Sequence, residues 1–164
     1  DGYLAEVDRL QGVAKAQFFP TTPPTEIFTD DWAHLWSDAI NANANYKQAA
    51  TKWEGAIAMV MSPDGNMGIP EERVVIADLW HGDCRSARAA TAADLAEVPY
   101  LIRATPTNWK SVLSGKTDPI VGLMGGKLKL AKGGLFALLP YAKAAKELVR
   151  SAIDVDTSFP TGWR

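Results

Sequence analysis

Two short stretches of the sequence carry residue types that proteins use for binding and catalysis. The first is LMGGKLKLAKGG at 123–134, in which a lysine follows two glycines, as in loops that hold phosphate. A phosphate-binding P-loop has the pattern G-x-x-x-x-G-K-[ST] between a strand and a helix. Here the spacing from Gly122 to Gly126 is one residue too short, and Leu128 stands where that pattern has a hydroxyl. The alternation of lysine and leucine instead predicts a half-buried strand over 127–131, with glycine turns on both sides.

The second stretch places Asp78, His81 and Asp83 close together at the end of a predicted strand. Carboxylates and an imidazole are ligands for several divalent metals. One histidine with two carboxylates at a turn is also the ordinary composition of a solvated hairpin. We therefore expect no metal, no cofactor and no catalytic site, and an enzyme built on these three residues is only a third hypothesis.

Charge and cysteine content narrow the class of protein. The chain has 17 basic and 19 acidic residues, a net charge of −2, which gives no electrostatic footprint for nucleic acid. Its one cysteine, Cys84, excludes an internal disulfide, so the fold does not depend on an oxidising compartment. The first ten residues include charged side chains, and no apolar run approaches the ~20 residues that span a bilayer. We expect no signal peptide and a cytoplasmic location.

The prolines divide the chain into two parts. Apolar residues recur at a loose helical spacing over 3–17, and FFPTTPPTE at 18–26 cannot lie inside a helix or a central strand. We therefore predict that residues 1–24 are an N-terminal helix with a proline-rich connector. Residues 25–164 are predicted to be the main domain, with a short C-terminal tail.

The main domain alternates between helical and strand periodicities. Apolar side chains at i, i+3 and i+4 from Trp32 predict a first helix, capped by Thr29 or Asp30. Five predicted strands follow at 55–62, 73–81, 84–91, 99–105 and 127–131. Because the first four follow one another through short connections, we expect an antiparallel meander with helices on one face. The predicted fold is α+β: a five-stranded, mainly antiparallel twisted sheet covered by helices.

Helices are also predicted around and after the last strand. Thr107 is the expected cap of a short helix that ends before Gly115, and Asp118 followed by proline is expected to start the next one. The final helix begins near Leu135 and carries a proline at position 140, so we expect it to be kinked or to start there.

Tryptophan and methionine are distributed over these elements in a way that leaves two interpretations open. Most of these side chains fit ordinary core packing. The same set also fits a roomy apolar cavity between sheet and helices, which is the usual character of a small-molecule pocket. The residues concerned are Trp32, Trp36, Trp53, Trp80, Trp109, Met59, Met61, Met67 and Met124.

The stretch from Trp109 to Val149 resembles the C-terminal half of sterol carrier protein type 2 domains. That family has a short helix ending in glycine, an acidic residue near a proline, an apolar helix, a Gly-Lys-Leu-Lys strand and a glycine-rich turn into a last helix. Matching residues occur in the same order at 113–115, 118–119, 124, 126–129 and 133. The resemblance covers about residues 25–153.

This resemblance implies an apolar tunnel between sheet and helices that binds fatty acid, fatty acyl-CoA or sterol without catalysis. The first hypothesis is therefore a non-enzymatic binder, and carrier, of long-chain lipids. Helix faces and strand parity select eight candidate wall residues: Trp36, Met59, Trp80, Trp109, Leu113, Ile120, Met124 and Leu139.

Two kinds of partner besides the lipid are considered. The alternative function is an accessory or oligomerisation module of an enzyme that acts on hydrophobic substrates, with the N-terminal helix and the tail as docking parts. The cations Lys143, Lys146 and Arg150 on the last helix are either an ordinary solvated face or a transient contact with anionic membrane.

Overall fold

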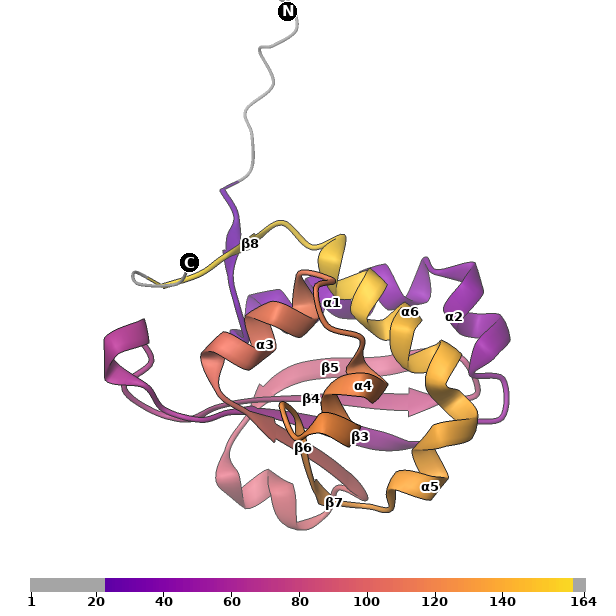
Figure 1. Cartoon of the computed structure of the whole chain (residues 1–164). Coiled ribbons are helices and arrows are strands. Elements are labelled where there is room, and N and C mark those ends of the chain that lie inside the picture. Colours follow the sequence, from indigo (N-terminus) through magenta and orange to yellow (C-terminus); the bar gives the residue numbers. More distant parts are fainter. Residues whose placement is uncertain (1–22, 161–164) are drawn as a thin grey trace, which may run out of the picture.

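Residues 23–160 are described by a computed structural model, in which a layer of helices lies on one sheet (Figure 1). The predicted helix at 3–17 lies outside the described residues, as do the first residues of the predicted connector. The domain boundary at residue 24 therefore stays a prediction.

Five strands form the sheet, in the spatial order β5-β4-β3-β6-β7. Each strand begins and ends within two residues of its predicted range. Their bounds are β3 Glu54–Met61, β4 Arg73–Trp80, β5 Asp83–Ala90, β6 Tyr100–Ala104 and β7 Lys129–Lys132.

The sheet is mixed, and this corrects the expected meander. β4 is antiparallel to β3 and to β5, and β7 is antiparallel to β6, but β6 runs parallel to β3. Parallel neighbours need a crossover connection. Residues 91–99 supply it: they leave the β5 edge, cross the sheet and bring the chain back beside β3. The α+β class with five strands is confirmed, and the sheet remains antiparallel in its other pairings.

The crossover covers the face of the sheet that the main helices leave open. It contains the short 3-10 helix η2, Ala92–Ala96, whose Leu95 packs with Val98 against Val60 and Ile76. In Figure 1 this segment lies below the sheet, opposite the main helices. Both faces of β3 and β4 are therefore covered. Successive apolar side chains along each strand point to opposite faces, so they pack alternately against the main helices and against the crossover.

The helices are short and mostly capped as their sequences require. Thr29 caps α1, where its hydroxyl accepts from the amide of Trp32 at 3.3 Å. The cap of α3 is Thr105 rather than the predicted Thr107, because Pro106 occupies the first helical position. Asp118 caps α4 as predicted. The bounds are α1 Asp30–Asn41, α2 Ala44–Ala49, α3 Pro106–Leu113, α4 Pro119–Gly125, α5 Leu135–Leu138 and α6 Ala142–Ile153.

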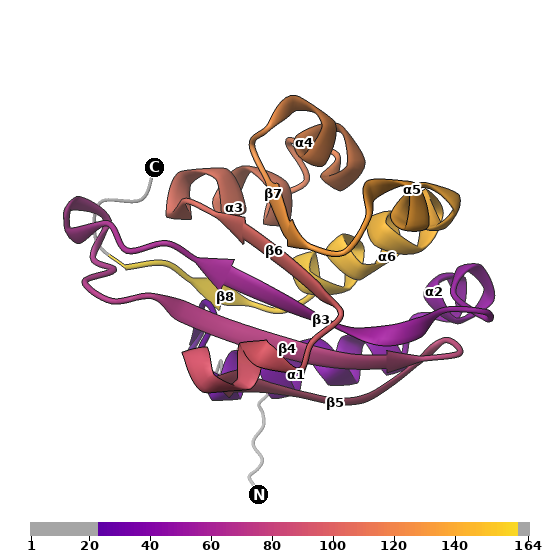
Figure 2. The same cartoon turned by 90° about the horizontal axis from the view of Figure 1, so that it is seen from below.

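Pro140 interrupts the last helix, as its position predicts. A 3-10 turn, η3 Leu139–Tyr141, separates α5 from α6. Figure 2 shows α3, α4, α5 and α6 gathered on the side of β6 and β7. α1 packs instead across β5 and β4. The helical layer thus has two parts: α1 on one side, and α3 to α6 on the other. The two parts meet above β3.

The ends of the described region lie side by side. β2, Thr25–Glu26, pairs in parallel with β8, Thr157–Ser158, in a separate two-stranded sheet (Figure 1). Beside it, Phe28 packs on both Trp32 and Trp109 with ring centroids 5.4 Å apart. Trp32 is 1% exposed and belongs to this aromatic core.

Candidate functional site

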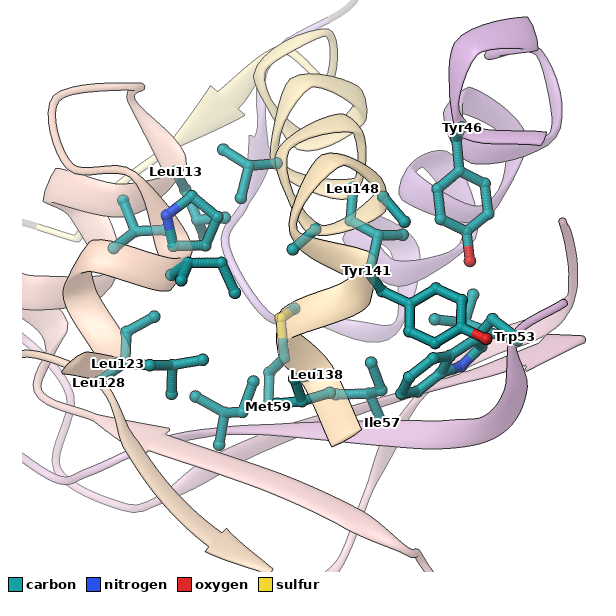
Figure 3. Close-up of a pocket in the computed structure, with 18 of the residues that line it drawn as sticks. Tyr46, Trp53, Ile57, Met59, Leu113, Leu123, Leu128, Leu138, Tyr141 and Leu148 are labelled. Atoms are coloured by element: carbon teal, nitrogen blue, oxygen red, sulfur yellow. The ribbon is translucent and has the colours of Figure 1, made fainter. Parts of the chain in front are cut away.

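An apolar cavity of about 90 Å³ lies between the sheet and the two parts of the helical layer. Its floor comes from alternate residues of the central strands, namely Ile57 and Met59 of β3, Leu79 of β4 and Ile102 of β6. Side chains of all six helices from α1 to α6 form most of the remaining walls, and Trp53, Leu128 and Tyr141 complete them from outside these helices. Figure 3 shows these side chains converging on the space between β3 and α6.

Strand parity determines which side chains reach the cavity. Met59 and Met61 belong to the core cluster on the helix side of β3, whereas Ala58 and Val60 belong to the cluster on the opposite side. This is the alternation that the sequence predicts. On β4, Leu79 has the parity of the helix side, so it lies in the floor of the cavity.

Three tryptophans line the cavity, and each has its indole N–H already bonded to the main chain. Trp36 donates to the carbonyl of Leu148 at 3.0 Å. Trp53 donates to the carbonyl of Gly55 at 2.8 Å, and Trp109 donates to that of Val60 at 2.8 Å. The rings therefore present carbon surface to the cavity while their polar atoms are satisfied.

Five of the eight predicted wall residues line the cavity: Trp36, Met59, Trp109, Leu113 and Ile120. They come from α1, β3, α3 and α4, so the structure brings together residues that are up to 84 positions apart in the chain. Their contact with a ligand stays a prediction.

The predicted positions of the other three need correction. Trp80 is 40% exposed and has the parity of Val74 and Ile76, so it points away from the helices. Met124 is 68% exposed, because only the side of α4 that carries Ile120 faces the sheet. Leu139 lies in the 3-10 turn η3, and it is outside the lining. The proline-induced turn changes the helical phase at that point.

Sequence reasoning missed the α2 side of the cavity. α2 has only six residues, too few for a periodic signal, yet it contributes Tyr46 to the lining. Asn43 caps this helix, with its side-chain oxygen accepting from the Tyr46 amide at 3.0 Å. An asparagine before a short helical stretch was the available signal. Tyr141 of η3 is the second phenol of the lining that was not predicted.

The charged groups near the β4–β5 turn do not converge. Asp78 pairs with Arg85 at 3.0 Å, His81 with Glu54 at 2.6 Å and Asp83 with Lys47 at 2.8 Å. Nowhere in residues 23–160 do three or more His, Cys, Asp or Glu side chains form a group that could hold a metal. Burial raises the pKa of the neighbouring Cys84 thiol, which disfavours the reactive thiolate.

The glycine-rich segment at 123–134 contains the end of α4 and the whole of β7. Gly126 has φ +88 and caps α4 in the left-handed conformation. The residues that follow form a strand, as the alternation of lysine and leucine predicts, and Leu128 is buried in the cavity wall.

Comparison with solved structures identifies the family. A crystal structure of sterol carrier protein 2 is 42% identical in sequence, with a TM-score of 0.73, and the match covers 79% of this chain and 99% of that chain. The chain belongs to the sterol carrier protein 2 family. The resemblance to this family is thereby confirmed.

Two further solved structures are similar to this chain. A conserved hypothetical protein of Thermus thermophilus, described as possibly a sterol carrier protein, is 39% identical with a TM-score of 0.74; 86% of this chain and 96% of that chain are covered. The apo form of sterol carrier protein 2 from Yarrowia lipolytica shares the fold at 14% identity and a TM-score of 0.51, over 73% of this chain and 88% of that chain. No family model and no curated protein matches the chain.

Proposed function

We propose that this protein binds long-chain lipids in the apolar cavity and carries them without catalysing a reaction. The ligands proposed are a fatty acid, a fatty acyl-CoA or a sterol-like molecule. The proposal is based on the chemistry of the cavity walls. Their surface is mostly carbon, and the indole N–H groups of the three lining tryptophans are bonded to main-chain carbonyls. Membership of the sterol carrier protein 2 family supports it.

Burial of an acyl chain supplies the driving force. Each methylene that leaves water contributes roughly 0.8 kcal/mol. A chain of about a dozen carbons therefore reaches micromolar affinity even after the costs of ordering the ligand. Affinity should thus depend mainly on chain length.

The cavity has to enlarge before it can hold such a chain. Its volume of about 90 Å³ is smaller than an engineered cavity of about 150 Å³ that binds a molecule the size of benzene. We propose that α4 and α5 move outward on binding. The chain around them is suited to this movement, because glycines at 125–126 and 133–134 flank the segment between the two helices.

A titration followed by tryptophan emission tests the proposal. Protein stripped of lipid is titrated with fatty acids and acyl-CoAs of increasing length. We expect saturable changes in emission, with affinity rising about fourfold per methylene until the cavity is full. Trp80→Phe should keep the response, because Trp80 lies on the other face of the sheet, whereas Trp36→Phe should reduce it. The absence of a saturable response at every chain length would contradict the proposal.

The accessory-module alternative depends on parts of the chain that the structure only partly describes. Its docking elements are the predicted N-terminal helix at 3–17 and the C-terminal tail, and 1–22 and 161–164 lie outside the described residues. Lipid that co-purifies with the protein would favour the lipid carrier, and a stable complex with an enzyme would favour the accessory module. Within the part of the chain that is described, no helix has the length and apolarity needed to cross a bilayer.

A further inference from the structure

Two phenols, Tyr46 and Tyr141, line the cavity, and neither hydroxyl forms a hydrogen bond with a described residue; of the two, only Tyr46 is buried. Tyr46 is 1% exposed and lines the cavity, and no described residue forms a hydrogen bond with its hydroxyl. Figure 3 shows this ring descending from α2 with its oxygen directed toward Trp53 and Tyr141. A buried hydroxyl without a hydrogen bond is costly, so native structures usually provide a partner.

The position of Tyr46 is fixed independently of that hydroxyl. Asn43 caps α2 through the Tyr46 amide, and its side-chain nitrogen donates to Ser151 of α6 at 3.0 Å. The ring is therefore held over the cavity by main-chain and helix–helix contacts. Its hydroxyl contributes nothing to those contacts, so it is available to a ligand.

We propose that the Tyr46 hydroxyl is the polar anchor of the ligand, and that it selects a lipid carrying a neutral hydroxyl group bound at the α2 end of the cavity. This inference rests on the proposed lipid-binding function. It adds that the head group of the lipid, a hydroxyl, is the end that enters the cavity. A phenol both donates and accepts one hydrogen bond, which matches the needs of an alcohol.

The surroundings of Tyr46 favour a neutral group over an anion. Burial raises the pKa of Tyr46, as do the nearby Cys84 and Asp83, so the phenol stays protonated. Among the described residues that line the cavity, none carries a charged side chain that would balance an ionised head group. Burying an unpaired carboxylate or phosphate here would be far more costly than burying an alcohol. A fatty acid or acyl-CoA would therefore keep its ionised group at the opposite end, in solvent.

Two ligands that differ only in the hydroxyl test the anchor. Dodecanol and tridecane have the same length, because tridecane carries a methyl group where dodecanol has its hydroxyl. Their dissociation constants are measured for the wild type, for Tyr46→Phe and for Tyr100→Phe. Tyr100 is the matched control, because its ring packs on Trp53 from outside the lining. We expect Tyr46→Phe to lower the preference for dodecanol over tridecane by about fivefold and Tyr100→Phe to leave that preference within twofold of the wild type.

The outcomes separate this inference from the proposed function. If the wild type and Tyr100→Phe bind both ligands and Tyr46→Phe keeps the wild-type preference, the hydroxyl serves only a bound water and the anchor is refuted. If the wild type binds neither ligand, the lipid-binding function and the anchor both fail. A structure of the dodecanol complex gives a second measurement that needs no variant. The ligand oxygen should lie about 2.5–3.0 Å from the Tyr46 hydroxyl, and an oxygen at the other end of the cavity would overturn the proposal.

Discussion

The side-chain amide of Asn43 donates a hydrogen bond of 3.0 Å to the hydroxyl of Ser151, which joins the start of α2 to the last turn of α6. Ser151 is fully buried, and its own hydroxyl donates to the carbonyl of Glu147 at 2.9 Å. The same asparagine caps α2 through the amide of Tyr46. One short polar network therefore connects two helices that both line the cavity.

Asn43→Ala should lower the free energy of unfolding by about 1–3 kcal/mol. The substitution removes a helix cap and leaves buried polar groups without a donor. Urea unfolding measures the loss. Asn45→Ala is the matched control on the same helix; its side chain is exposed, and we expect a change within about 0.5 kcal/mol. Equal effects of the two substitutions would show that the Asn43 network adds nothing to stability.

A pair of substitutions on α4 tests the corrected helix phase. Leu123 lines the cavity, whereas its neighbour Met124 is 68% exposed. Leu123→Asp should destabilise the domain by several kcal/mol or abolish lipid binding, because it places a carboxylate in an apolar wall. Met124→Asp should keep both the melting temperature and the affinity for a long-chain fatty acid. A loss of binding in Met124→Asp alone would restore the face predicted from the sequence.

The sequence predicts those features that depend on neighbours along the chain. Alternation on β3 predicts that Met59 faces the helices, and the Asp118–Pro119 pair predicts the start of α4. Both follow from local rules of strand parity and helix capping. Trp80 obeys the same alternation, and its parity with Ile76 already places it away from the helices once the covered face is known.

What the sequence leaves open depends on contacts between distant segments. The parallel pairing of β6 with β3 results from the path of the 91–99 crossover, which no local pattern encodes. Tyr46 becomes a cavity residue because α2 packs against α6, where Asn43 bonds to Ser151, a residue more than a hundred positions away in the chain. Such relationships arise from tertiary packing, so periodicity alone does not predict them.

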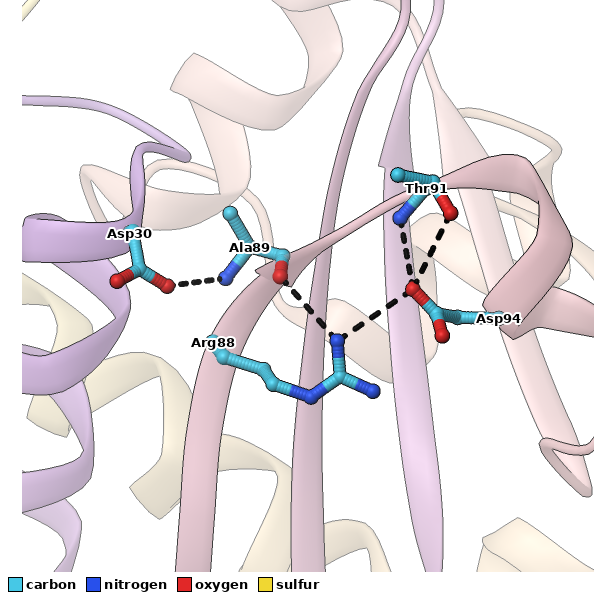
Figure 4. A network of polar contacts seen from close by, with 5 residues as sticks. All are labelled: Asp30, Arg88, Ala89, Thr91 and Asp94. Carbon is cyan, nitrogen blue, oxygen red and sulfur yellow. Dashed lines mark hydrogen bonds and ion pairs between the residues drawn. The ribbon is translucent and has the colours of Figure 1, made fainter.

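The turn that caps η2 should make stability depend on acid pH. The Asp94 carboxylate accepts from the Thr91 amide at 2.9 Å and from Arg88 at 3.4 Å, and these contacts lower the pKa of Asp94 (Figure 4). A lowered pKa in the folded state means that the contribution is complete above the ordinary pKa of 3.8. It is lost as the pH falls through the lower, folded value.

Asp94→Asn measures this contribution. The variant should melt below the wild type at pH 7, and the two melting temperatures should converge as the pH falls through the lowered pKa of Asp94, because the wild-type carboxyl then becomes neutral as well. Asp30 provides a comparison on the same edge, because its carboxylate accepts from the Ala89 amide at 2.9 Å without touching Arg88 (Figure 4). A difference between Asp94→Asn and the wild type that stays constant as the pH falls from 7 until the domain unfolds in acid would contradict the assignment.

The two glycines before α5 have different roles, which alanine substitutions should separate. Gly133 has φ +96, and a Cβ there would collide with the Tyr100 ring. Gly134 has open space around it and no such backbone angle. Gly133→Ala should therefore destabilise the domain by about 2 kcal/mol or more, from the left-handed backbone and the displaced ring. Gly134→Ala should change stability by less than about 1 kcal/mol, and thermal melting of both variants is the measurement.

Transfer of lipid to membranes should respond to the charge of α6. Lys143 and Arg150 are exposed on this helix, and each basic residue near an anionic surface contributes about 1 kcal/mol, less at high salt. Lys146 is left unchanged, because its Nζ forms an ion pair of 3.4 Å with Oδ2 of Asp118, the residue that caps α4. We expect faster transfer to anionic than to neutral vesicles, and Lys143→Glu with Arg150→Glu should remove that difference without changing the equilibrium affinity for the lipid.

The control for this prediction is a charge reversal elsewhere on the surface. Lys52 is exposed between α2 and β3. Lys52→Glu therefore changes the net charge by the same amount as either single reversal on α6, and it leaves α6 unaltered. If transfer follows net charge alone, Lys52→Glu slows it in proportion. If α6 is the contact, the slowing is confined to the Lys143 and Arg150 variant and disappears as salt screens the charges. Equal transfer rates to neutral and anionic vesicles at low salt would show that the cations of α6 are an ordinary solvated face, and the helix would then serve only as a wall of the cavity.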